Sequence, residues 1–153
     1  MKKIVVITAL LIAGFIALPT LHAEEGHEHE HKLVGGPKGG RLLDNTDPRA
    51  EFFVEKDRSV TITFYDDALK PVAAMEQTVT VIAEMEGVKT TVEFEKKDDM
   101  LISRGALPDG HALNLVVQFK QTVDAKPVNF RFVYEDHICG ECKRAEYACI
   151  CGH

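Results

Sequence analysis

Between residues 41 and 135, apolar and polar side chains alternate in six separate segments, and this period of two limits the possible folds more than any other feature. Successive side chains of a strand point to opposite faces, so the alternation predicts strands with one buried face. A further short strand is expected over residues 98–104. The side chains expected on the buried faces are Ala50, Phe52 and Val54; Val60, Ile62 and Phe64; Val79, Val81 and Ala83; Val88, Thr90, Val92 and Phe94; Leu113, Leu115, Val117 and Phe119; and Val128, Phe130, Phe132 and Tyr134.

Turn residues separate these segments. Lys56-Asp57-Arg58 and Glu86-Gly87 are short enough for hairpins, and Pro108-Asp109-Gly110 is a strong turn signal. No long stretch has the helical period, which argues against alternating strands and helices. We therefore predict an all-β domain over residues 41–135, either an antiparallel β-sandwich of the immunoglobulin-like kind or a small barrel, with about six to eight strands.

Residues 1–23 have the pattern of a secretory signal peptide. Lys2 and Lys3 precede an apolar run from Ile4 to Leu18, and small residues follow it. The run is short for a membrane span and no second hydrophobic stretch follows, so we expect no membrane span after cleavage. An uncleaved N-terminal anchor is the alternative. We expect a periplasmic or secreted protein that begins at Glu24.

The predicted mature chain is acidic. The whole sequence has 24 Asp and Glu against 18 Lys and Arg, and removal of Lys2 and Lys3 leaves a net charge of −8 when the histidines are neutral. An acidic surface argues against nucleic acid and anionic lipid as partners, and it is compatible with cations. No Ser/His/Asp or Cys/His arrangement indicates catalysis, so we do not predict an enzyme.

Residues 24–40 are expected to form a flexible leader rich in histidine and glycine. Its first part places His27, His29 and His31 at every second position, where an extended chain puts all three on one side. Imidazole is a ligand for zinc, copper and nickel, so these histidines are candidate metal ligands. The alternative is a solvated, disordered segment. Four glycines around Pro37 then predict a linker.

The tail, residues 136–153, holds all the cysteines of the chain: Cys139, Cys142, Cys149 and Cys151. The C-x2-C step lets two thiolates reach one ion from a tight turn, and the second pair can approach from another short arm. Four sulfurs around one ion give the closed tetrahedral site of structural zinc, whereas two or three suffice for Cu(I). His137 and His153, near the two ends of the tail, can complete the ligand set.

Two other interpretations of the tail stay open. Exported proteins meet a disulfide-forming environment, and four cysteines make two bridges. Bridges between the pair Cys139/Cys142 and the pair Cys149/Cys151 are favoured, because a bridge within the second pair closes a strained ring. The spacing of Cys139 and Cys142 also matches a thioredoxin-type redox pair, although the strand–helix setting of that motif is absent.

Residues 39–72 and the later segment Leu107-Pro108-Asp109-Gly110-His111 resemble a small β domain near the N-terminus of some periplasmic adaptor subunits of heavy-metal efflux pumps. The resemblance implies an envelope protein concerned with metal ions, with an envelope or efflux protein as partner. The chain is too short for the helical hairpin and other domains of an adaptor, and the adaptors' Cys-Met metal module has no counterpart in its tail. The matching elements are Gly39-Gly40, Ala50-Glu51-Phe52, the hairpin into Val60-Thr61-Ile62, Lys70-Pro71 and Leu107-Pro108-Asp109-Gly110-His111.

These patterns together predict an exported protein that binds zinc or copper through the C-terminal cysteines. In this interpretation it buffers or hands on the ion in the cell envelope, and the leader histidines act as a weak capture arm. The alternative is a β-sandwich that binds another protein, has a tail locked by two disulfides, and holds no metal.

Overall fold

A computed structural model describes residues 34–151. The predicted signal peptide, the leader histidines His27, His29 and His31, and His153 lie outside the described residues. Within residues 34–151, no helix has the length and apolar character needed to cross a membrane. The elements are β1 (Arg41–Leu43), β2 (Arg49–Val54), β3 (Ser59–Tyr65), β4 (Pro71–Val72), β5 (Thr78–Met85), β6 (Val88–Lys97), β7 (Met100–Ala106), β8 (Ala112–Lys120), β9 (Val128–Glu135) and a 3₁₀ turn, η1 (Glu146–Ala148).

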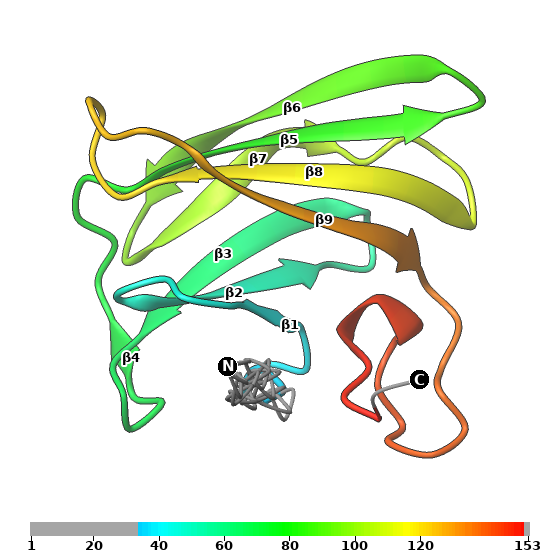
Figure 1. Ribbon diagram of the computed structural model, residues 1–153, viewed down its shortest axis with the longest axis horizontal. Helices are drawn as coiled ribbons and strands as arrows, with labels where there is room; N and C mark the ends of the chain where they lie inside the picture. Colours follow the sequence, from blue (N-terminus) through cyan, green and yellow to red (C-terminus); the bar gives the residue numbers. More distant parts are fainter. Residues whose placement is uncertain (1–33, 152–153) are drawn as a thin grey trace, which may run out of the picture. The chain divides into compact units, whose positions relative to one another are not determined.

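The strands form one antiparallel sheet in the order β1-β2-β3-β7-β6-β5-β8-β9, with β4 paired to β3 (Figure 1). Strand β6 joins the two halves, because its first part pairs with β5 and its last part with β7. The sheet curls until β2 returns to β9, where the rings of Phe52 and Phe132 lie 5.3 Å apart. The fold is therefore an antiparallel, nearly closed barrel, which confirms the all-β prediction in its barrel form.

The predicted buried faces are confirmed for β2, β3, β5 and β8. Every side chain in those four sets is at most 8 % exposed. Two predicted core residues at the beginnings of strands are exceptions, since Val88 is 69 % and Val128 is 50 % exposed. Val88 is the first residue of β6, directly after the hairpin turn, and Val128 is the first residue of the edge strand β9. Each therefore has fewer neighbouring strand residues to bury its side chain than a residue in the middle of the sheet. The strand expected over residues 98–104 is β7.

The predicted hairpin turns have the local chemistry that such turns require. Between β2 and β3, the Asp57 carboxylate accepts hydrogen bonds from the Ser59 N–H at 3.0 Å and the Ser59 hydroxyl at 2.6 Å. Between β5 and β6, Glu86 and Gly87 both have positive φ angles, 52° and 82°. Positive φ at both central residues gives a two-residue turn whose twist matches the strands.

The glycine-rich segment before β1 is packed against the barrel, which differs from the linker that its composition predicted. Its backbone turns at Gly36–Gly40 and covers the outer face of β2. There Glu51, a fully buried carboxylate, accepts hydrogen bonds from the Gly40 N–H at 2.7 Å and the Tyr65 hydroxyl at 2.7 Å. A Cβ atom on Gly40 would lie 2.3 Å from the Phe52 carbonyl oxygen, so this close approach needs glycine.

Candidate metal centre

The first two cysteines lie in a small loop that follows β9. The loop is closed by an antiparallel bridge between Ile138 and Ala145 and by the Cys139 N–H, which donates to the Arg144 carbonyl at 2.8 Å. The Lys143 N–H donates back to the Cys139 carbonyl at 3.2 Å. This tight turn brings Cys142 next to Cys139, as the C-x2-C spacing predicted.

The second two cysteines lie on a separate arm that begins with η1. The Cys149 N–H donates to the Glu146 carbonyl at 3.0 Å, which ends the 3₁₀ turn, and the chain is extended at Cys149. The Cys151 N–H then lies 3.4 Å from the Cys149 sulfur and donates to it. The arm thereby returns both sulfurs to the first loop.

The four sulfurs form a compact cluster. The Sγ atoms of Cys139 and Cys149 are 3.5 Å apart, those of Cys142 and Cys149 3.7 Å, and those of Cys139 and Cys151 3.8 Å. All four lie within 4.8 Å of one another. A tetrahedron with metal–sulfur bonds of about 2.3 Å has edges of about 3.8 Å, so these spacings fit one ion at the centre. They exceed the S–S bond of about 2.05 Å, so none of the three measured pairs is a disulfide.

The four thiols differ in burial and in ease of ionisation. Cys139 is buried, and the other three are half-buried. The backbone N–H groups of Ile150 and Arg144 lower the pKa of the Cys142 thiol because they stabilise its charged form. Burial, together with the neighbouring sulfur of Cys149, raises the pKa of the Cys151 thiol. A cation among these sulfurs favours the thiolate of every ligand and offsets the crowding of negative charge.

Tyr147 connects the cysteine arms to the barrel. It is 5 % exposed, and its hydroxyl accepts a hydrogen bond from the Val54 N–H of β2 at 3.1 Å. Its ring packs on Phe52 of β2 and on Tyr134 of β9, with ring centroids 6.1 and 5.2 Å apart. The Arg41 guanidinium of β1 donates to its carbonyl at 3.2 Å. Burial raises the pKa of Tyr147 to about 12.

Tyr147 therefore fills the seam between the edge strands β1 and β9, which do not pair with each other. Figure 1 shows the segment after β9 folding back so that η1 lies near both edges. Sequence reasoning missed this residue. The one available signal was a large aromatic side chain between two cysteine pairs in an otherwise polar tail.

Of the nine predicted ligands, the structure describes five and brings four of them together. Among the described residues, the four cysteines are the one group of three or more His, Cys, Asp or Glu side chains close enough to share an ion. His137 is outside this cluster, because it is exposed and its Nε2 atom lies 3.8 Å from the Glu146 carboxylate. His27, His29, His31 and His153 lie outside the described residues.

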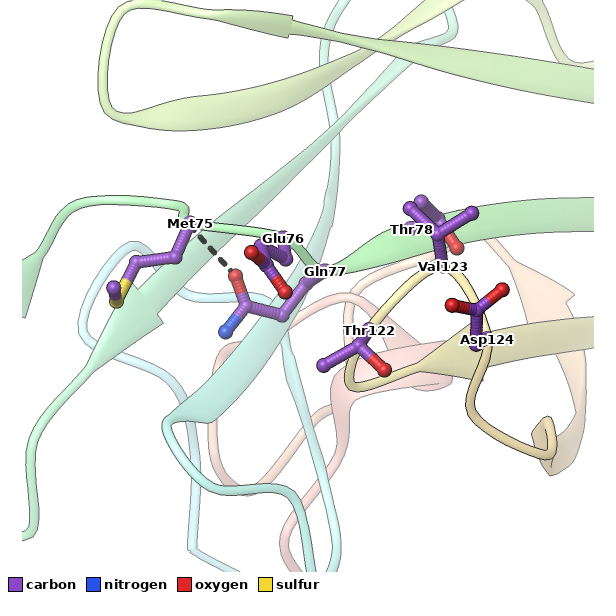
Figure 2. A pocket seen from close by; sticks show the side chains of 7 residues that line it. All are labelled: Met75, Glu76, Gln77, Thr78, Thr122, Val123 and Asp124. Carbon is purple, nitrogen blue, oxygen red and sulfur yellow. Dashed lines mark hydrogen bonds between the residues drawn. The ribbon is translucent and has the colours of Figure 1, made fainter.

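A hollow of about 590 Å³ lies where β8 ends and β5 begins (Figure 2). Its two acidic residues, Glu76 and Asp124, come from different loops, and in residues 34–151 no third metal-ligating side chain joins them. Gln77 uses its side-chain oxygen to accept the Met75 N–H at 2.7 Å. This hollow thus has no candidate metal centre.

Comparison with known proteins gives no further guide. No family model matches the chain, and no curated protein or solved structure matches it significantly. The resemblance to efflux-pump adaptors therefore stays a prediction, and the cysteine cluster is the feature of the described residues that bears on function.

Proposed function

We propose that the protein binds one transition-metal ion, with zinc preferred, through the thiolates of Cys139, Cys142, Cys149 and Cys151. The observation that carries this proposal is the spacing of their sulfurs, 3.5 to 3.8 Å for the three measured pairs. Four thiolates at tetrahedral spacing are typical ligands of zinc or of an iron–sulfur centre. Cu(I) needs only two or three thiolates, so the fourth sulfur favours zinc over copper.

We further propose that the protein buffers or hands on this ion in the cell envelope. Three of the four cysteines are half-buried, so incoming ligands can reach the ion from solvent. All ligands come from one short stretch, residues 139–151, which can open without unpairing the barrel strands. The export part of this proposal depends on the signal-peptide pattern of residues 1–23. His27, His29 and His31 are proposed as a weak capture arm.

Native mass spectrometry of protein purified without chelator, followed by thiol counting after denaturation, tests the metal site. We expect one bound ion and four free thiols. The absorption spectrum separates colourless zinc from coloured iron. Cys142→Ser should lose the ion under the same conditions, whereas Glu76→Gln, a change at an exposed residue of another part of the barrel, should retain it. Unchanged metal content in Cys142→Ser refutes the proposal.

The competing function is an interaction module whose tail is locked by disulfides. One observation favours it: the close pairs Cys139–Cys151 and Cys142–Cys149 are cross-pairs that two bridges require. The same mass measurement distinguishes the two functions, because each bridge removes two hydrogen atoms from the reduced mass and leaves no free thiol at that pair. A metal-free, fully bridged protein establishes the alternative.

A further inference from the structure

An open cleft of about 400 Å³ is lined in part by the loop that carries the first two cysteines. It lies between β2, the end of β9 and the loop that carries the first two cysteines. Two of its lining residues, Lys143 and Arg144, directly follow Cys142 in the sequence. Small-molecule sites typically measure about 300–1,000 Å³, so the cleft has room for a small organic ligand.

The cleft has a surplus of positive charge on a chain that is acidic overall. Lys38 is paired with the Glu55 carboxylate at 3.6 Å. Three further cations, Lys56, Lys143 and Arg144, also line the cleft, with Asp136 as the remaining acid. Within residues 34–151 none of these three makes an ion pair with Asp or Glu. Gathered like charges attract an anion and are stabilised by it.

The rest of the cleft fits the carbon skeleton of such an anion. Tyr134 and Tyr147 line it and are each 5 % exposed, while Ile138 at its rim is 61 % exposed. The Arg144 guanidinium is held in place because it donates to the Gly36 carbonyl at 3.1 Å. Arginine binds carboxylates with a planar fork of N–H donors, so we assign Arg144 as one carboxylate contact in the cleft.

We propose that this cleft binds a small organic polycarboxylate, which serves as the entering ligand when the ion leaves the cysteine cluster. The second part rests on the proposed function. Carboxylate oxygens are zinc ligands, and Lys143, which lines the cleft, directly follows the half-buried Cys142 in the chain. Each oxygen that binds the ion replaces one sulfur, and the released thiolate takes up a proton from water. The cleft thus positions an exchange ligand beside the site.

Calorimetric titration of the full-length, metal-loaded protein with tricarballylate tests the cleft. Tricarballylate has three carboxylates but lacks the hydroxyl of citrate, so it competes less for the ion. Affinity should fall about tenfold in the double variant Lys56→Gln/Lys143→Gln, which removes two positive charges but keeps polar side chains. The control Lys70→Gln/Lys126→Gln changes the net charge equally at exposed positions outside the cleft, and it should bind as the unchanged protein does.

The exchange role is tested by the rate of zinc transfer to a chelating dye. Citrate should accelerate zinc transfer, and the rate should saturate at the citrate concentration that fills the cleft. The variant Lys56→Gln/Lys143→Gln should lose this acceleration, whereas the control Lys70→Gln/Lys126→Gln should keep it. Equal tricarballylate affinity in the cleft and control variants overturns the binding site. Binding without acceleration overturns the exchange role. Metal content and thiol count of the same samples report separately on the proposed function, since tricarballylate binding does not require the ion.

Discussion

The barrel and the cysteine segment, residues 137–151, are ordered by different means. The barrel buries a continuous apolar core and pairs its backbone through an antiparallel ladder over eight neighbouring strands. The cysteine segment has one isolated bridge and one three-residue 3₁₀ turn, and its buried residues are Cys139, Tyr147 and Ala148. The contrast indicates that the barrel supplies a stable frame, while the segment depends on its sulfurs and on one aromatic anchor.

Tyr147 is where the two regions meet. It belongs to the cysteine segment by sequence and to the barrel core by packing, since its ring contacts Phe52 and Tyr134. An ion that fixes Cys142 and Cys149 on either side of it therefore also limits its exit from the seam. Four predictions separate what each region contributes, from the largest expected change in stability to the smallest.

The largest effect is expected from Phe52→Ala in the barrel. Phe52 is fully buried, and removal of a buried aromatic side chain costs about 3–5 kcal/mol of unfolding free energy. Denaturant titration followed by circular dichroism measures the loss. Val88→Ala, a truncation at a 69 % exposed position, is the control and should change stability by less than about 0.5 kcal/mol. A loss for Phe52→Ala as small as that of the control contradicts the packed core.

Zinc removal should have a smaller and more local effect. At free zinc a hundred times the dissociation constant, a bound ion adds about 2.7 kcal/mol to unfolding free energy. Chelation should remove that increment and speed amide exchange in residues 137–151, while the amides of β3 and β5 stay protected. Exchange that rises equally throughout the barrel would show that the frame itself depends on the ion.

Tyr147→Phe should cost about 2 kcal/mol, because the buried Val54 N–H loses its acceptor while the ring stays in place. Thermal unfolding of the zinc-loaded protein measures this loss. A stability equal to that of the unchanged protein means that the hydroxyl does not contribute to closing the seam.

The same variant has a pH signature. The pKa of Tyr147 is raised to about 12, so its contribution to stability is fully present below pH 10 and declines as the pH rises towards 12. Tyr65 and Tyr134 also have raised pKa values, chiefly from burial, and lose stability in the same direction. Tyr147→Phe should therefore lose less stability between pH 9 and 11 than the unchanged protein. An identical loss contradicts the raised pKa.

Most of the barrel was predictable because burial alternates along its strands. The failures arise where the outer face of the sheet is covered as well. Glu51 stands at a position that the period of two assigns to solvent, yet the segment Gly36–Gly40 covers it and supplies backbone donors. The composition of that segment predicted a linker. A glycine-rich sequence is compatible both with a flexible chain and with a backbone that packs closely against another strand, so composition does not distinguish the two.

The cysteine cluster was predictable from spacing, because a tight turn and a short arm both bring paired sulfurs together. The role of Tyr147 was not predictable, since its contact with Val54 joins residues 93 positions apart. Local patterns carry no information about such distant partners. Zinc, export and handing-on of the ion stay predictions for the experiments above.

The open seam of the barrel also bears on solubility. Strands β1 and β9 are both sheet edges, and an uncovered edge presents unpaired backbone groups to the edge of another molecule. In this fold η1 contacts both edge strands, although four of the eight side chains of β9 stay exposed. We expect truncation after β9, or release of Tyr147 from the barrel, to remove these contacts and to favour pairing of an edge strand with a neighbouring copy. Such a chain should therefore self-associate at a lower concentration than the intact protein.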